Sequence, residues 1–101
     1  MPKHKRTKAT AIPVRVKWEV WERDGHCCII CGQPGDPVCH VINRSQAGLG
    51  IKENIVTLCT YHHMEMDNGK NGKALRERAI EYLKSHYPGW ERDKVIYHKQ
   101  P

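Results

Sequence analysis

The sequence contains no phenylalanine and no long apolar run, so hydrophobic burial alone gives this chain little stability. Hydrophobic residues make up 39% of its 101 residues, and the mean hydropathy is −0.72. A chain of this length forms one small domain. A core this thin generally needs disulfides, a metal or oligomerisation to support it. The longest apolar stretch spans only a few residues, so the sequence predicts no membrane-spanning helix.

A secretory signal is also missing from the sequence. Residues 1–17 are basic, but no apolar stretch follows that could form the hydrophobic region of a signal peptide. We therefore expect a cytoplasmic protein, in which thiols stay reduced. The cysteines number five, an odd count that cannot pair off completely within one chain. A bound metal is accordingly the favoured support for the small core.

Acidic residues are absent from the first 18 positions, and this makes the charge distribution uneven. The net charge is +6, and the first acidic residue is Glu19. The basic residues before it are Lys3, Lys5, Arg6, Lys8, Arg15 and Lys17. The rest of the chain carries eleven basic and eleven acidic residues and is formally neutral. A basic arm on a neutral body favours nucleic acid as the partner over a membrane surface, since no amphipathic helix accompanies it. A merely solubilising tail is the alternative.

Proline, glycine and hydrophobic spacing divide the chain into an arm, a domain and a tail. Residues 1–12 lack periodicity and are predicted to be a flexible arm, which is followed by a domain at 13–87. The tail at 88–101 carries enough apolar surface to fold back on that domain. Pro13 and Gly25 bracket a predicted helix, although the alternating valines between them would also suit a strand.

Within the domain, short strands alternate with helices. We predict strands at 38–42 and 55–58, a helix from Thr60 to Asn68-Gly69 with a left-handed glycine cap, and a third helix at 75–86. Pro88-Gly89 stops the last helix. The pattern predicts a small α+β fold with an N-terminal and a C-terminal helix flanking the two strands.

Four residues have the spacing of a structural zinc site. Cys28 and Cys31 form a C-x-x-C pair, and Cys59 and His62 form a C-x-x-H pair. Two such half-sites are typical of a tetrahedral structural Zn²⁺, because each tight turn presents two ligands. Cys27 is out of register with the pair beside it, so we expect it to be packed or half exposed.

A wider set of motifs surrounds these ligands and resembles the HNH endonuclease family, more narrowly its small phage and prophage members. The matching segments are Trp21-Glu22-Arg23-Asp24-Gly25, Cys39-His40-Val41-Ile42-Asn43-Arg44-Ser45, Gly48-Leu49-Gly50, Glu53-Asn54-Ile55-Val56-Thr57-Leu58-Cys59, His62-His63 and Asp67-Asn68-Gly69. The resemblance covers residues 13–70 and, more loosely, the third helix with Tyr87-Pro88-Gly89-Trp90. It implies a ββα-metal core at about residues 38–69, held by zinc.

The resemblance also implies roles for individual residues. His40 would be the general base that activates water against a phosphodiester, Asn54 would tether the loop that orients it, and His63 would bind a catalytic divalent ion. Asp67 lies one helical turn after His63 and can reach the same ion. Imidazole has the near-neutral pKa that such a base needs. A carboxylate and an imidazole suit Mg²⁺, Mn²⁺ or a later ion such as Ni²⁺.

Each assignment has a simpler alternative. His40 alone could be a structural histidine, Asn54 a turn residue, and His62 and His63 could exchange their roles. Many HNH proteins carry a further metal ligand just before the base, where this chain has Cys39. Cys39 is either a soft ligand to the catalytic ion or a small packed hydrophobe, since neighbouring residues of a regular strand point to opposite faces.

The sequence therefore predicts a zinc-stabilised, metal-dependent DNA endonuclease. Arg44 could hold a phosphate beside the scissile bond, and the arm residues Lys3, Lys5, Arg6 and Lys8 would contact DNA. The resemblance suggests action with phage packaging proteins in the host-cell cytoplasm. The alternative is a non-catalytic zinc-knuckle DNA-binding module.

Overall fold

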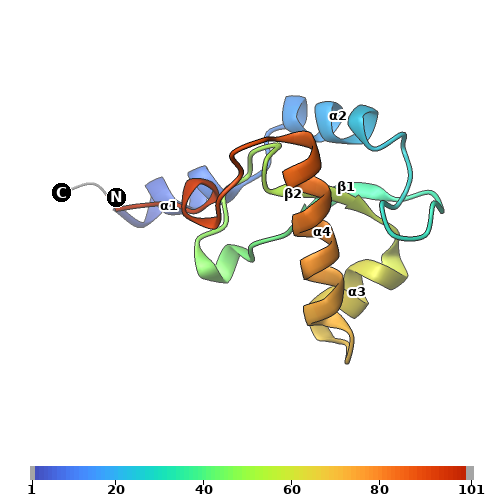
Figure 1. The fold of residues 1–101 in the computed structure, drawn as a ribbon. Coiled ribbons are helices and arrows are strands. Elements are labelled where there is room, and N and C mark those ends of the chain that lie inside the picture. The colour runs from blue at the N-terminus through green and yellow to red at the C-terminus, as the bar shows by residue number, and fades with distance from the viewer. Residues whose placement is uncertain (1, 100–101) are drawn as a thin grey trace.

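The computed structural model of the chain describes residues 2–99 and shows helices around a two-stranded sheet (Figure 1). The elements in chain order are α1 (Pro2–Thr10), α2 (Val14–Arg23), β1 (Asp36–His40), the 3₁₀ helix η1 (Arg44–Gln46), β2 (Ile55–Leu58), α3 (Thr60–Asn68), α4 (Gly72–His86) and the 3₁₀ helix η2 (Arg92–Val95). The predicted α+β class is confirmed. Across residues 2–99, none of the helices has the length and apolarity to cross a membrane.

The sheet is an antiparallel β1–β2 pair in which Cys39 lies opposite Val56 and His40 opposite Ile55. The predicted second strand is confirmed, whereas the first begins and ends two residues earlier than the predicted 38–42. Its end has a local cause. The Val41 N–H still donates to the Asn54 carbonyl at 2.8 Å, but the reciprocal bond is missing. The Asn54 N–H donates to the Ile51 carbonyl at 2.9 Å instead, and the Val41 carbonyl accepts the Arg76 side chain, so the ladder of the two strands stops there.

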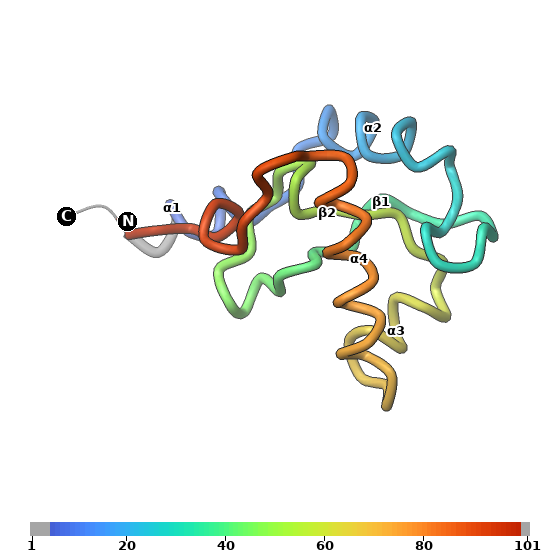
Figure 2. Tube along the Cα trace, in the orientation of Figure 1, coloured from blue at the N-terminus to red at the C-terminus, as the bar shows by residue number. Residues whose placement is uncertain are grey.

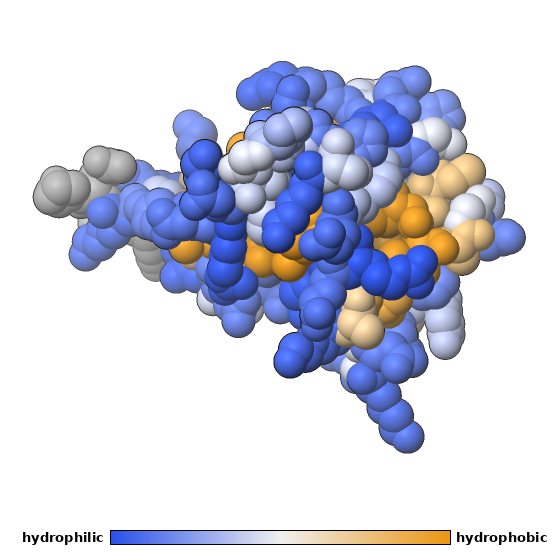
Figure 3. Space-filling view, in the orientation of Figure 1, coloured by the Kyte–Doolittle hydropathy of each residue, from blue (hydrophilic) through white to orange (hydrophobic). Residues whose placement is uncertain are grey.

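The core lies between the sheet and helices α3 and α4. Its buried residues are Cys28, Cys39, Val41, Val56, Leu58, Met66, Leu75, Ala79 and Leu83. Helix α2 covers a second, smaller cluster, in which Val16 and Val20 contact Ile55. The helical interpretation of that segment is therefore confirmed over the strand alternative. In the view of Figure 3, most of the surface is hydrophilic. Hydrophobic residues are visible mainly at the centre of the view, between polar side chains, and at one side of the molecule.

The N-terminal arm differs from the prediction, because residues Pro2–Thr10 form helix α1. The segment is polar throughout and has no apolar stripe that would have revealed a packed helix. Polar contacts hold it instead. The Arg6 guanidinium donates to the carbonyls of Arg44 and Ser45 at 3.2 and 3.1 Å, and Gly50 N–H donates to the Ala9 carbonyl at 3.0 Å.

Two further expectations concern the chain after β2. The predicted left-handed cap at Gly69 is wrong, because its φ is −88°. A Cβ at this position would lie 2.2 Å from the carboxylate end of Glu65, a flexible side chain that can move aside, so space does not require glycine there either. The expected return of the tail is confirmed. Val95 is buried, and Ile96 pairs with Gly48 in an isolated antiparallel bridge.

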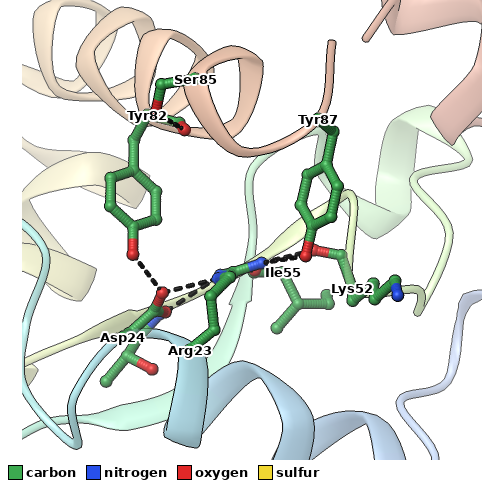
Figure 4. Close-up of polar contacts among 8 residues, drawn as sticks. Arg23, Asp24, Lys52, Ile55, Tyr82, Ser85 and Tyr87 are labelled. Carbon is green, nitrogen blue, oxygen red and sulfur yellow. Dashed lines mark hydrogen bonds and ion pairs between the residues drawn. The ribbon is translucent and has the colours of Figure 1, made fainter. Parts of the chain in front are cut away.

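A buried ion pair joins α2 to the sheet and to α4 (Figure 4). Arg23 donates two hydrogen bonds to the carboxylate of Asp24 at 2.7 and 3.0 Å, and their side chains are only 11% and 0% exposed. Asp24 also accepts the hydroxyl of Tyr82 at 2.6 Å and the backbone N–H of Thr57 at 2.9 Å. Burial opposes the charge of Arg23, but its bonds to Asp24 and Tyr87 raise its pKa above the usual value. Arg23 therefore stays charged, and its pair with Asp24 ties three elements together.

We expect Asp24→Ala to lower the free energy of unfolding by about 3–5 kcal/mol, because it leaves the charge of Arg23 buried without its partner. Urea unfolding of the metal-loaded chain measures this change. The matched control is Glu19→Ala, since Glu19 pairs with Arg15 at 3.8 Å on the exposed face of the same helix and contributes little there. Equal destabilisation by the two substitutions would contradict the role given to the buried pair.

Candidate metal centre and active site

The ligand cluster, which we define as Cys28, Cys31, Cys59 and His62, brings one atom of each side chain within 4.8 Å of every other. The Cys31 and Cys59 sulfurs lie 3.7 Å apart, and His62 Nδ1 lies 3.7 Å from the Cys28 sulfur and 3.4 Å from that of Cys59. In a tetrahedral zinc site the Zn–ligand bond lengths put two sulfurs about 3.8 Å apart, and a sulfur and a nitrogen about 3.6 Å apart. The four side chains are therefore placed to hold one metal ion.

Local backbone structure explains why the two half-sites meet. The Ile29 N–H donates to the Thr57 carbonyl of β2 at 3.0 Å, which fixes the first turn beside the second strand. Cys59 directly follows β2 and is the N-cap of α3, where its sulfur accepts the backbone N–H of His62 at 3.4 Å. A thiolate at this place also interacts favourably with the positive end of the helix.

The chemistry of Cys28 suits a ligand. Burial raises the pKa of its thiol, but backbone hydrogen bonds from the ligand turns outweigh burial and lower that pKa to about 7. One of these donors is the Ile30 N–H at 3.4 Å. Cys27 is half-buried and lies outside the ligand cluster, as its register predicts.

His40 stands at the end of β1, half-buried, with a defined hydrogen-bond partner. Its Nε2 lies 2.7 Å from the backbone carbonyl oxygen of Thr10. A carbonyl only accepts, so Nε2 carries the proton and the Nδ1 lone pair of the neutral ring is left for another role. Burial lowers the pKa of His40, and the nearby charges of Arg44 and His63 lower it further against the opposing effect of the Thr10 bond. His40 is therefore uncharged over more of the pH range than an exposed histidine.

Asn54 is fully buried and joins the two ends of the loop that follows β1. Its Oδ1 accepts the Ile42 N–H, while its Nδ2 donates to the carbonyls of Ile42 and Leu49 at 3.2 and 2.9 Å. Both the oxygen and the nitrogen of the Asn54 side-chain amide thus bind main-chain groups that lie outside the turn containing Asn54. This arrangement ties the loop to the start of β2.

His63 and Asp67 lie one turn apart on α3. The Nε2 of His63 is 3.5 Å from Oδ2 of Asp67, and the two side chains are 32% and 44% exposed. Two ligands at about 2.1 Å and at right angles around Mg²⁺ lie about 3.0 Å apart, so the pair fits two positions of a divalent ion after a small adjustment. His63, and not His62, has this carboxylate partner, while His62 belongs to the ligand cluster.

Cys39 points the other way. It is fully buried in the core, and its sulfur lies 3.6 Å from the sulfur of Met66. Burial raises the pKa of its thiol to about 12. This placement corrects the suggestion that Cys39 could be a metal ligand. Strand alternation turns its side chain to the face opposite that of His40, where Cys39 packs as a small hydrophobe.

The predicted DNA-contacting cations divide into two groups. Lys5 and Lys8 are exposed on α1. Arg6 and Arg44 are exposed too, but both contact neighbouring main chain, Arg44 reaching the Thr7 carbonyl at 3.3 Å. The side chain of Lys3 lies outside the part that the structure describes.

Sequence reasoning missed two contributors to this region. The Thr10 carbonyl holds His40, and no side-chain pattern could have revealed a main-chain acceptor. Arg76 of α4 donates to the Val41 carbonyl at 2.8 Å and to Asn43 Oδ1 at 3.1 Å, so it supports the chain just after β1. The sequence signal available for Arg76 was its position directly after Leu75, a core residue of the predicted third helix.

Comparison with protein-family models, with curated proteins and with solved structures finds no match to this chain.

We expect one tightly bound metal ion per chain, and we expect Cys59→Ser to lose both the ion and the folded state, because ligand binding and folding are coupled in such sites. Metal content and far-ultraviolet circular dichroism measure the two effects. Cys27→Ser is the matched control and should keep its metal, since Cys27 lies outside the ligand cluster. A metal-free Cys59→Ser chain with native helical content and a cooperative melt would contradict the expectation.

Proposed function

We propose that this chain is a zinc-stabilised, metal-dependent DNA endonuclease of the HNH type. The observation that carries the proposal is the combination of His40, oriented by a main-chain acceptor at the end of β1, with the His63–Asp67 pair on α3. The order of β1, β2 and α3, with the ligand cluster at the junction of β2 and α3, supports the ββα-metal core that the resemblance implies. Zinc is the proposed occupant of the ligand cluster, because three sulfurs and one imidazole nitrogen form a donor set that it prefers.

In this proposal His40 is the general base. Its Nδ1 accepts a proton from a water molecule while the water oxygen attacks the phosphorus of the scissile phosphodiester, and the bond to the 3′-oxygen breaks. The lowered pKa of His40 keeps the ring uncharged and ready to accept that proton. Asn54 holds the loop so that the base keeps its orientation during the reaction.

His63 and Asp67 would hold the catalytic divalent ion. Such an ion stabilises the charge that develops on the phosphoryl oxygens and on the leaving oxygen. With only two protein ligands, the remaining positions would be filled by water and by the substrate phosphate, as is usual for Mg²⁺. Exposed cations of α1, Lys5 and Lys8 among them, supply the attraction for the DNA backbone.

One observation favours the alternative of a DNA-binding module without catalysis. Cys39 faces the core, so it adds no third ligand to His63 and Asp67. A DNA-binding module would bind DNA through the same cations and would leave it uncut with every divalent ion.

The experiment is single-turnover cleavage of duplex DNA by His40→Ala. We expect the rate to fall at least about 100-fold, since a positioned general base contributes 10²–10⁴-fold. DNA affinity should stay nearly unchanged, because the base adds little to ground-state binding. Burial lowers the pKa of His40 below the ordinary 6.5, so wild-type cleavage should rise with pH through a midpoint below that value, and the variant should lack this rise.

His98→Ala is the control, because within residues 2–99 the contacts of His98 are with Asp93 on the exposed tail. It should cut at the wild-type rate. Cleavage by His40→Ala at the wild-type rate would overturn the assignment of the base.

A further inference from the structure

The N-terminal segment does more in this structure than carry positive charge. Its last helical residue, Thr10, is 3% exposed and presents its carbonyl to His40 Nε2 at 2.7 Å. The side chain of His40 thus has one ring nitrogen engaged by a segment that lies 30 residues earlier in the chain. Figure 2 shows α1 at one end of the molecule, beside the loop that runs on from β1.

Hydrogen bonds in both directions hold α1 against the loop that follows β1. The Arg44 guanidinium reaches back to α1, donating to the Thr10 hydroxyl at 3.2 and 3.3 Å and to the Thr7 carbonyl. Arg6 reaches in the opposite direction, to the carbonyls of Arg44 and Ser45. Two arginines that each bind the other's segment fix the position of α1 more firmly than either would alone.

A third contact fixes the main chain next to Thr10. Gly50 donates its N–H to the Ala9 carbonyl at 3.0 Å. Gly50 also lies so close to Ala11 that a Cβ added to Gly50 would be 1.9 Å from the Ala11 carbonyl oxygen. Only glycine allows this approach. Residues Ala9 to Ala11, which include the carbonyl on His40, are therefore seated directly against the loop that Asn54 tethers.

We propose that residues 2–12 are a positioning element of the catalytic site, in which the Thr10 carbonyl selects the Nε2–H form of His40 and orients its ring. The proposal rests on the endonuclease function proposed above. A neutral imidazole otherwise exchanges between two tautomers, and only the form with a free Nδ1 lone pair can act as the base on that side. The arm then contributes to the rate of cleavage as well as to DNA affinity.

The test displaces the segment without removing charge. Gly50→Ala forces residues 9–11 away from the loop, and Thr10→Val removes the hydroxyl that Arg44 binds while keeping the side-chain shape. Thr57→Val is the matched control for the second variant. Thr57 is equally buried, and within residues 2–99 its hydroxyl has no hydrogen-bond partner.

Four quantities are measured for each variant: metal content, the dissociation constant for duplex DNA, the single-turnover rate at saturating DNA, and the His40 tautomer from ¹⁵N chemical shifts. For Gly50→Ala we expect a metal-loaded chain, a loss of the single Nε2–H form and a rate about 100-fold lower, because a misplacement of about 1 Å can cost that much. The dissociation constant should change far less than the rate, since α1 keeps all its positive charges and the base acts in the transition state. Thr10→Val should show a smaller loss of rate, and Thr57→Val none.

Three results would overturn the proposal. The first is a Gly50→Ala chain that keeps the wild-type tautomer and rate. The second is a Gly50→Ala chain that fails to fold while Thr10→Val equals Thr57→Val in tautomer and rate. The third is faster cleavage by the variants, which would make α1 a cover over the base. A wild-type chain that does not cleave DNA rejects the proposed function separately, and the tautomer measurement still decides whether Thr10 fixes His40.

Discussion

The ligand cluster joins two segments that the small hydrophobic core alone would hold weakly. One segment is the turn carrying Cys28 and Cys31, and the other is the junction of β2 and α3, which carries Cys59 and His62. Fixing that junction also fixes the direction in which α3 leaves the sheet. The positions of His63 and Asp67 follow from it, because they lie on the first two turns of the same helix.

Three sets of polar contacts hold the rest of the structure around the candidate site. Asn54 ties both ends of the loop after β1, and Arg76 of α4 supports the chain at Val41. The buried Arg23–Asp24 pair connects α2 to β2 and α4. Buried polar groups of this kind stabilise only when their partners are complete. A chain with few large apolar residues thus keeps a defined shape through directed contacts.

The sequence predicted most of the elements and the ligand cluster, because these depend on local signals. Pro13 and Gly25 bracket α2, the residues of β2 are β-branched or apolar, and two short ligand motifs define the metal centre. The arm was misread because α1 has no apolar stripe, and its contacts come from Arg44 and Gly50, far away in the chain. The role of Cys39 stayed open until strand pairing fixed which face it occupies. Long-range polar contacts leave no periodic trace in a sequence, and this limited the prediction of the site more than that of the fold.

The central claim is that the metal-loaded chain supports a DNA-cleaving site on β1 and α3. Its most direct measurement is the relaxation of supercoiled plasmid by zinc-loaded protein, with and without added Mg²⁺, Mn²⁺ or Ni²⁺, beside a zinc-loaded His63→Ala variant. We predict nicked or linear plasmid with at least one of the added ions and no cleavage when no ion is added. The His63→Ala variant should lose cleavage at unchanged zinc content. Intact plasmid with all three ions, from a folded and zinc-loaded wild-type chain that binds DNA, would contradict it.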